Sequence, residues 1–211
     1  MRFKDRVEAG QKLAEKLTKY RGENTVILAL PRGGAVLGAE IAKALEAPLD
    51  LVIPRKIGHP QNPEYAVAAV TEGGELVAND AEVSSLDPEW FKGDVQKEIA
   101  EAKRRRQTYL QGKNQAQLRG KTVIIVDDGV ATGLTMRAAI KDVRARDPER
   151  IVVAVPVTPK DTAGILQREA DELVALDIPT MYLGAVGAYY QEFTQVEDGE
   201  VIEILEVSSK A

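Results

Sequence analysis

The sequence of 211 residues contains no cysteine, and its single histidine is His59. The absence of cysteine excludes disulfides, cysteine-ligated metals and thiol catalysis, and it fits a reducing compartment. One histidine excludes a histidine-rich metal site. No apolar stretch approaches the roughly 20 residues that cross a bilayer, and the opening segment MRFKDRVEAGQKLAEKL predicts an amphipathic helix rather than a signal peptide. We therefore expect a cytoplasmic protein with no membrane partner.

Aromatic residues make up only 5% of the chain, whereas 44% of it is hydrophobic and 29% is charged, with a net charge of -5. This acidic balance argues against broad nucleic-acid binding. The length and the hydrophobic content suit one core of ordinary size. We therefore expect a single domain over residues 1–211.

Strand-like and helix-like segments alternate along the chain. This alternation predicts an α/β fold with a doubly wound, mainly parallel sheet, whose ligand crevice lies beyond the carboxyl ends of the strands. The predicted strands cover 24–30, 49–54, 65–70, 75–78, 121–127, 150–157 and 172–176, and the clearest helices cover 7–20, 35–45 and 87–113 and begin again near 134.

Residues 75–118 are predicted to form an inserted loop and helical segment, most of it the long polar helix at 87–113. This helix carries Arg104, Arg105 and Arg106 in succession. We favour a solvated face with pairs such as Glu101 and Arg105, which lie four residues apart. A direct binding role is the alternative, and the helix could also cover the active site or form a subunit contact.

The most informative segment is VIIVDDGVATGLT at 123–135. Its four β-branched residues predict a buried parallel strand, and Asp127 and Asp128 follow at the carboxyl end of that strand. Gly129 and Gly133 allow the backbone to approach a ligand closely, and the helix that begins near Leu134 points its amino end at the same place. Backbone amides and a positive helix end favour a phosphate group there.

Three other interpretations compete for this segment. An acidic pair followed by glycine is also an ordinary strand–turn–helix junction, with Asp as cap and Gly as turn residue. A Walker loop is excluded because GxxxxGK[ST] does not occur. A phospho-receiver domain also ends a strand in an acidic pair, but such domains place the pair at their first strand and lack the GVATG loop.

The segment resembles, over its whole length, the phosphoribosyl pyrophosphate motif of type I phosphoribosyltransferases. The resemblance implies that Asp127 and Asp128 bind the ribose 2- and 3-hydroxyls and serve as the protein's ligands for Mg²⁺. In the absence of ligand, repulsion between the two carboxylates should raise at least one pKa. The resemblance also implies a 5-phosphate site built from the hydroxyl of Thr135 and the loop Gly129, Val130, Ala131, Thr132 and Gly133.

Two further segments resemble the same family. LPRGGAVLGAEIA resembles its pyrophosphate-binding loop, which implies contacts from Arg32, Gly33 and Gly34, although a Gly-Gly turn with an exposed Arg is the ordinary alternative. IPRKIGHP resembles the Arg-Lys pair that opens the mobile catalytic loop of adenine and orotate transferases. It implies that Arg55 and Lys56 reach pyrophosphate when the region 55–80 closes. His59 is expected to be an exposed loop residue rather than a general base.

The segment AVGAYYQEFTQV resembles the part of purine transferases in which an aromatic ring stacks on the base. Tyr189, Tyr190 and Phe193 are the candidate rings, and packing within the last helix or strand is their alternative role. Residues 180–211 are expected to contribute to a small hood. Hypoxanthine-guanine enzymes carry an Asp at the place of Ala131, so the ATGLTM run leans toward an adenine-like arrangement.

The resemblance implies a Mg²⁺-dependent phosphoribosyltransferase that moves the 5-phosphoribosyl group from phosphoribosyl pyrophosphate to a nitrogenous base, a purine by the closest motif, and releases pyrophosphate. The catalytic residues would be Asp127, Asp128, Arg32 and Lys56. A homodimer is expected. The alternative is a non-catalytic regulator of the same fold that senses a nucleotide or phosphoribosyl pyrophosphate and uses the arginine cluster at 104–106 to bind RNA or a partner.

Overall fold

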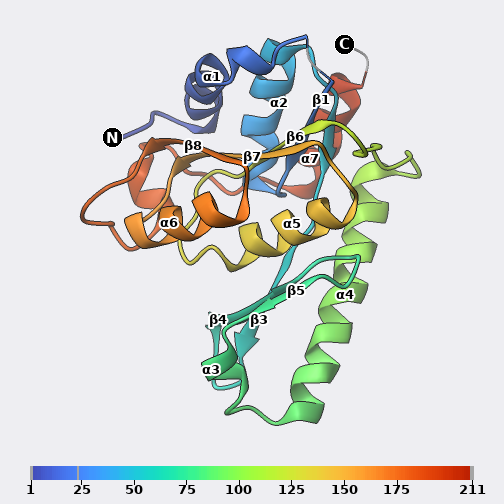
Figure 1. Ribbon diagram of the computed structural model, residues 1–211, viewed down its shortest axis with the longest axis vertical. Coiled ribbons are helices and arrows are strands. Elements are labelled where there is room, and N and C mark those ends of the chain that lie inside the picture. The colour runs from blue at the N-terminus through green and yellow to red at the C-terminus, as the bar shows by residue number, and fades with distance from the viewer. Residues whose placement is uncertain (1, 23, 210–211) are drawn as a thin grey trace.

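A five-stranded parallel sheet forms the centre of the computed structural model, which describes residues 2–22 and 24–209 (Figure 1). The strand order is β2-β1-β6-β7-β8, and all neighbouring strands run parallel. The predicted α/β fold with a mainly parallel sheet is confirmed. Residues 1, 23 and 210–211 of the predicted domain lie outside the described residues. The strands are β1 (Thr25–Ala29), β2 (Leu49–Leu51), β6 (Thr122–Val126), β7 (Arg150–Val157) and β8 (Glu172–Asp177).

Helices cover both faces of this sheet (Figure 1). Helices α1 (Arg6–Lys16) and α2 (Gly33–Leu45) lie on one face, and α5 (Leu134–Ala145) and α6 (Lys160–Glu169) lie on the other. Alternate residues of β6 divide between the two cores, because Ile124 packs with the α1 and α2 side while Ile125 packs with the α5 and α6 side. With both faces buried, the strands show unbroken apolar runs instead of an alternating pattern.

A smaller antiparallel sheet extends away from the central sheet (Figure 1). It consists of β3 (Arg55–His59), β4 (Asn62–Val70) and β5 (Leu76–Ala78), in the order β3-β4-β5. The prediction of only two strands here was wrong, because the segment with Arg55 and Lys56, expected to open a loop, forms β3 and pairs with β4. His59 ends this strand instead of lying in a loop, and its Nδ1 accepts a bond from the amide of Gln61.

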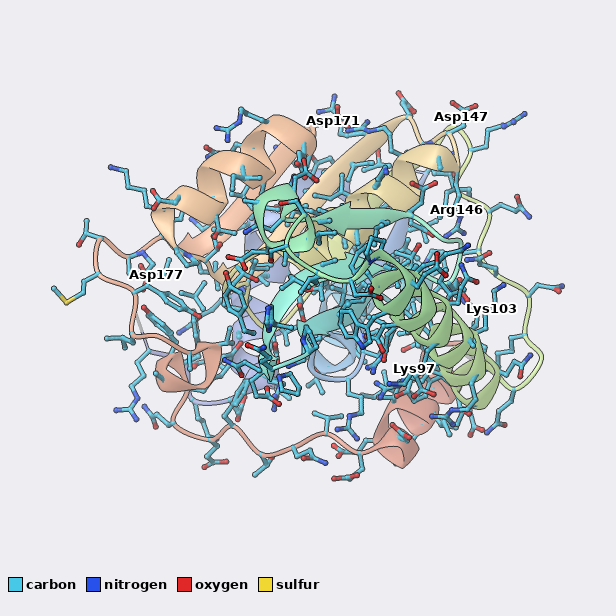
Figure 2. The ribbon with its side chains drawn as sticks, turned by 90° about the horizontal axis from the view of Figure 1, so that it is seen from below. Lys97, Lys103, Arg146, Asp147, Asp171 and Asp177 are labelled. Carbon is cyan, nitrogen blue, oxygen red and sulfur yellow. The ribbon has the colours of Figure 1, made fainter. Side chains whose placement is uncertain are left out.

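The long helix α4 (Pro88–Leu110) runs along this small sheet and follows the short helix α3 (Asp80–Val83). Hydrophobic residues of α4 pack on the sheet, and Lys97 and Lys103 project from the helix into solvent (Figure 2). The packed side chains include Ile57, Ala68 and Val70 of the sheet and Phe91, Val95 and Ile99 of α4.

The three consecutive arginines of α4 are all engaged in ion pairs. Arg105 bonds to Glu101 at 2.8 Å, as the spacing predicted, and Arg104 bonds to the same carboxylate at 2.7 Å. Arg106 turns inward instead, where it donates to the carbonyl oxygen of Leu51 at 2.6 Å and pairs with Glu72. The prediction of a solvated face therefore holds for Arg104, holds in part for Arg105, which is half-buried, and was wrong for Arg106.

The last part of the chain packs against α2 and α4. It contains the 3-10 turn η2 (Val186–Tyr189) and helix α7 (Asp198–Ser208), while another such turn, η1 (Thr18–Tyr20), follows α1. The hydroxyl of Tyr109 at the end of α4 donates to Asp198 at the start of α7, at 2.8 Å. None of the helices in the described ranges is long and apolar enough to cross a membrane.

Candidate active site

The carboxyl ends of β1 and β6 lie side by side, and the chain leaves them toward opposite faces of the sheet. After β1 the chain enters α2 and returns to β2, whereas after β6 it enters α5 and returns to β7. Such a reversal of strand order is a topological switch point, where open α/β sheets bind ligands. Residues 31–34 and 127–135 both begin at this point.

Asp127 and Asp128 follow the last residue of β6. Oδ1 of Asp127 accepts a bond from the amide of Asp128 at 2.8 Å, and Oδ2 of Asp128 accepts one from Nε of Arg6 at 2.7 Å. Burial, followed by the neighbouring Asp128 carboxylate, raises the pKa of Asp127 well above its usual range. Burial also raises the pKa of Asp128, although the guanidinium of Arg6 opposes this rise. The direction of this shift is the predicted one, but burial, and not repulsion between the two carboxylates, is its main cause.

Two glycines bring the amino end of α2 against this acidic pair. A Cβ atom on Gly33 would lie 1.9 Å from Oδ2 of Asp128, and one on Gly34 would lie 2.7 Å from the carbonyl oxygen of Val126. No side chain caps this end of α2 in the structure. The partial positive charge of the helix end therefore faces Asp128. The peptide bond between Pro31 and Arg32 is cis.

The loop 129–133 leads into the amino end of α5. Gly129, at φ 155°, and Gly133, at φ 85°, adopt backbone conformations that favour glycine. Thr162 of α6 supports the loop by donating from Oγ1 to the carbonyl oxygen of Ala131 at 2.8 Å. No side-chain cap is present at Gly133, so the first amides of α5 are placed to bind an anion. Ala131 and Thr132 are exposed, Thr135 is partly buried, and Val130 is buried.

The cations that were predicted to meet pyrophosphate are paired with carboxylates of this chain. Arg32 lies 3.7 Å from both Glu197 and Asp198 at the start of α7. Arg55 bonds to Glu98 of α4 at 2.8 Å, so it faces away from the crevice. Of these two arginines, Arg32 lies at the switch point, in the short connection between β1 and α2, whereas Arg55 lies on β3.

Lys56 lies on the opposite face of the small sheet from Arg55. It pairs in register with Ala69, and Ala69 packs against Leu134 at the start of α5. Because directly paired residues of antiparallel strands share a face, Lys56 stands on the side that faces α5. Its Nζ bonds to Glu64 at 3.0 Å, an exposed pair that is available for exchange.

The predicted base-stacking rings differ in accessibility. Tyr189 and Tyr190 are each 3% exposed and belong to the core, so neither ring has a face open to a base in this structure. The hydroxyl of Tyr190 instead donates to the carbonyl oxygen of Asp128 at 2.6 Å. Phe193 is 38% exposed, and its ring packs with the guanidinium of Arg6 at 3.8 Å and with the ring of Tyr190, whose centre lies 4.9 Å away. Phe193 is therefore the one predicted ring with accessible surface.

Arg6 is the site residue that sequence reasoning missed. It lies 122 positions before Asp128 in the chain, and the first turn of a surface helix gives no local indication of such a pairing. The amphipathic pattern of α1 predicts only which side of the helix is buried. The contact follows from the tertiary packing of α1 beside α2.

A family model described as a phosphoribosyl transferase domain matches residues 3–192. Two curated proteins of Mycobacterium tuberculosis, from strains CDC 1551 / Oshkosh and H37Rv, are named provisionally as phosphoribosyl transferases and are each 40% identical to the chain over 206 residues. These matches cover 97% of this chain and 46% of each relative. The chain thus spans about half the length of the curated relatives that it matches.

Two solved structures share the fold of this chain. The crystal structure of TT1426 from Thermus thermophilus is 42% identical and has a TM-score of 0.82, over 97% of this chain and 98% of that one. A hypothetical protein from Neisseria gonorrhoeae, solved with bound ppGpp, shares the fold over 98% of both chains at 16% identity and a TM-score of 0.50. The chain therefore belongs to the family of phosphoribosyl transferase domains.

Proposed function

We propose that this chain transfers the 5-phosphoribosyl group of phosphoribosyl pyrophosphate to a nitrogenous base and releases pyrophosphate. The observation that carries the proposal is the meeting of an acidic pair with two uncapped helix ends at the switch point. The amino end of α5 suits a 5-phosphate, and the amino end of α2 suits a pyrophosphate. The carboxylates between them suit ribose hydroxyls. A pentose that carries phosphate groups at both ends matches this arrangement.

In the proposed reaction a nitrogen of the base forms a bond to the anomeric carbon as the carbon–oxygen bond to pyrophosphate breaks. The bonding electrons leave with pyrophosphate, and positive charge develops on the ribose ring. Asp127 and Asp128 orient the sugar through its hydroxyls, and their negative field favours that developing charge. The amides of the 129–135 loop hold the 5-phosphate, which fixes the anomeric carbon relative to the base.

The donor set around the crevice fits a magnesium ion held largely by its substrate. Among the described residues no group of three or more ligating side chains occurs, so at the switch point the acidic pair would be the protein's contribution to the ion. The carboxylate oxygens that accept neither bond described above are Oδ2 of Asp127 and Oδ1 of Asp128. Mg²⁺ is commonly bound by one or two carboxylates, substrate oxygens and water. When bound, it would neutralise charge on the departing pyrophosphate.

A purine is the proposed acceptor. Ala131 in the ATG run supports an adenine-like arrangement, and Phe193 offers an accessible ring beside the acidic pair. The regulatory alternative has less support, because the arginine cluster at 104–106 is engaged in ion pairs with this chain's own acids. The cytoplasmic location and the homodimer stay predictions.

The proposal is tested by measuring pyrophosphate release from phosphoribosyl pyrophosphate with adenine, guanine, hypoxanthine, xanthine, uracil and orotate, with and without Mg²⁺. We expect Mg²⁺-dependent release with a purine and its loss in Asp128→Asn. Asp147→Asn is the matched control, because Asp147 is an exposed acid at the rim of the molecule (Figure 2). No release with any base, alongside Asp128-independent binding of the sugar, would reject the proposal.

A further inference from the structure

Arg6 makes three contacts that join separate parts of the candidate site. Its Nε donates to Oδ2 of Asp128 at 2.7 Å, and its Nη1 donates to the carbonyl oxygen of Thr194 at 2.7 Å. Its guanidinium also lies 3.8 Å from the centre of the Phe193 ring. The side chain is 11% exposed, so this cation is largely desolvated.

The pair formed by Arg6 and Asp128 lies against the predicted pyrophosphate loop. The position of a Cβ on Gly33 would be 1.9 Å from Oδ2 of Asp128 and 3.0 Å from Nε of Arg6. Oδ2 of Asp128 is thus enclosed by the guanidinium and by the first residue of α2. In this arrangement that oxygen has no room for a ribose hydroxyl, and a carboxylate stands at the helix end where a pyrophosphate is expected.

Charge balance indicates how the site changes when an anionic sugar binds. Turning the carboxylate of Asp128 toward ribose would take the carboxylate away from Arg6 and leave this nearly buried cation with only the Thr194 carbonyl and the Phe193 ring as contacts, which is costly. A pyrophosphate at the amino end of α2 would restore a partner, because an arginine guanidinium suits phosphate oxygens. Arg32, the cation predicted for this role, is 3.7 Å from two acids of α7 and is more exposed, at 32%.

We propose that Arg6 is a partner-switching binding residue, which holds Asp128 in the free protein and binds the pyrophosphate group of the sugar once Asp128 turns to the ribose. This inference rests on the proposed function. It assigns to the first turn of α1 a direct role in substrate recognition. It also predicts that the contribution of Arg6 depends on the pyrophosphate group and not on the ribose 5-phosphate part.

The test uses isothermal titration calorimetry of the full chain with Mg²⁺ and three probes: phosphoribosyl pyrophosphate, inorganic pyrophosphate and ribose 5-phosphate. Arg6→Gln should weaken the first two about 10- to 100-fold, the range for losing one charge-assisted contact, and should change ribose 5-phosphate less than about threefold. Arg6→Lys should restore most of the pyrophosphate affinity, because it keeps the charge. Lys12→Gln is the control, because it removes a more exposed cation, at 39%, from the same helix.

Each other outcome overturns the inference in a recognisable way. Equal weakening of all three probes by Arg6→Gln, without recovery in Arg6→Lys, would mean that Arg6 only ties Thr194 and Phe193 to Asp128. Unchanged pyrophosphate affinity in Arg6→Gln would also reject it. If Arg6→Gln does not fold, the folded Arg6→Lys variant takes its place. Its smaller loss of affinity should fall on phosphoribosyl pyrophosphate and pyrophosphate and not on ribose 5-phosphate, and an equal change for all three probes would reject the inference. Failure of the unaltered protein to bind any probe would reject the proposed function itself.

Discussion

The closest backbone approach in the candidate site can be tested by adding a single methyl group at Gly34. A Cβ there would lie 2.7 Å from the carbonyl oxygen of Val126 and 3.1 Å from Cα of Asp127. Both atoms belong to the backbone, so no side-chain rotation relieves the contact. We expect Gly34→Ala to move the amino end of α2 away from β6 by several tenths of an ångström.

The cost of this shift can be separated from the effect of replacing glycine in a helix. Gly34 is the second residue of α2, and Gly199 is the second residue of α7 with no atom near its Cβ position. Alanine gains up to about 1 kcal/mol over glycine in a helix, a gain that the two positions share. Overpacking costs about 1–3 kcal/mol of stability, so Gly34→Ala should have a free energy of unfolding lower than that of Gly199→Ala by this amount. For a chain of this size it corresponds to about 2–12 °C in melting temperature.

The functional readout of the same variant is kcat/KM for phosphoribosyl pyrophosphate. Displacing the pyrophosphate loop from the acidic pair should lower it at least about tenfold, because sub-ångström misplacement of reacting groups is costly. Gly199→Ala should leave it unchanged. If Gly34→Ala matches Gly199→Ala in both melting temperature and kcat/KM, the close packing of α2 on β6 has no bearing on the site, and the reasoning is refuted.

Three further substitutions test individual groups. Asp128→Asn should abolish pyrophosphate release while leaving the circular dichroism spectrum intact, and unchanged turnover would reject its role in sugar binding. Burial raises the pKa of Asp127, so its contribution to stability is complete at low pH and is lost as the pH rises through that raised pKa. Asp127→Asn should therefore raise the melting temperature near neutral pH, with a gain that shrinks in acid; a gain independent of pH would contradict this. Arg106→Met removes the arginine that bonds to Asp50 and Glu72, and it should lower the free energy of unfolding in urea by about 3–5 kcal/mol. A decrease below about 1 kcal/mol would show that water replaces the guanidinium.

The central sheet was predictable because its signals are local. Unbroken β-branched runs such as 123–126 identify strands buried on both faces, and parallel connection rules then bring their carboxyl ends together. The acidic pair could be placed at the ligand crevice for the same reason. The exact neighbour of β6 could not be read from the sequence, since strand order depends on which face each helix covers.

Strand β3 was missed because its own pattern is weak. Ile57 is the one fully buried residue among Arg55–His59, and the pairing with β4 contains irregular register at Gly58. Its strand conformation depends on β4 and on the packing of α4, which are long-range contacts. The burial of Tyr189 and Tyr190 could not be predicted either, because an aromatic pair suits a core as well as a binding surface.

The arrangement of charge explains how the proposed site could select its substrate. In the free chain Arg6, Arg32 and Lys56 are each paired with a carboxylate of the same chain. Breaking a largely buried pair such as Arg6 with Asp128 is unfavourable unless both ions find new partners. Phosphoribosyl pyrophosphate supplies both, since it carries hydroxyls for the acid and phosphate oxygens for the cation. Ribose 5-phosphate supplies hydroxyls for the acid, but its one phosphate is assigned to the 129–135 loop, so Arg6 would be left without a new anionic partner. This difference would discriminate between the two sugars.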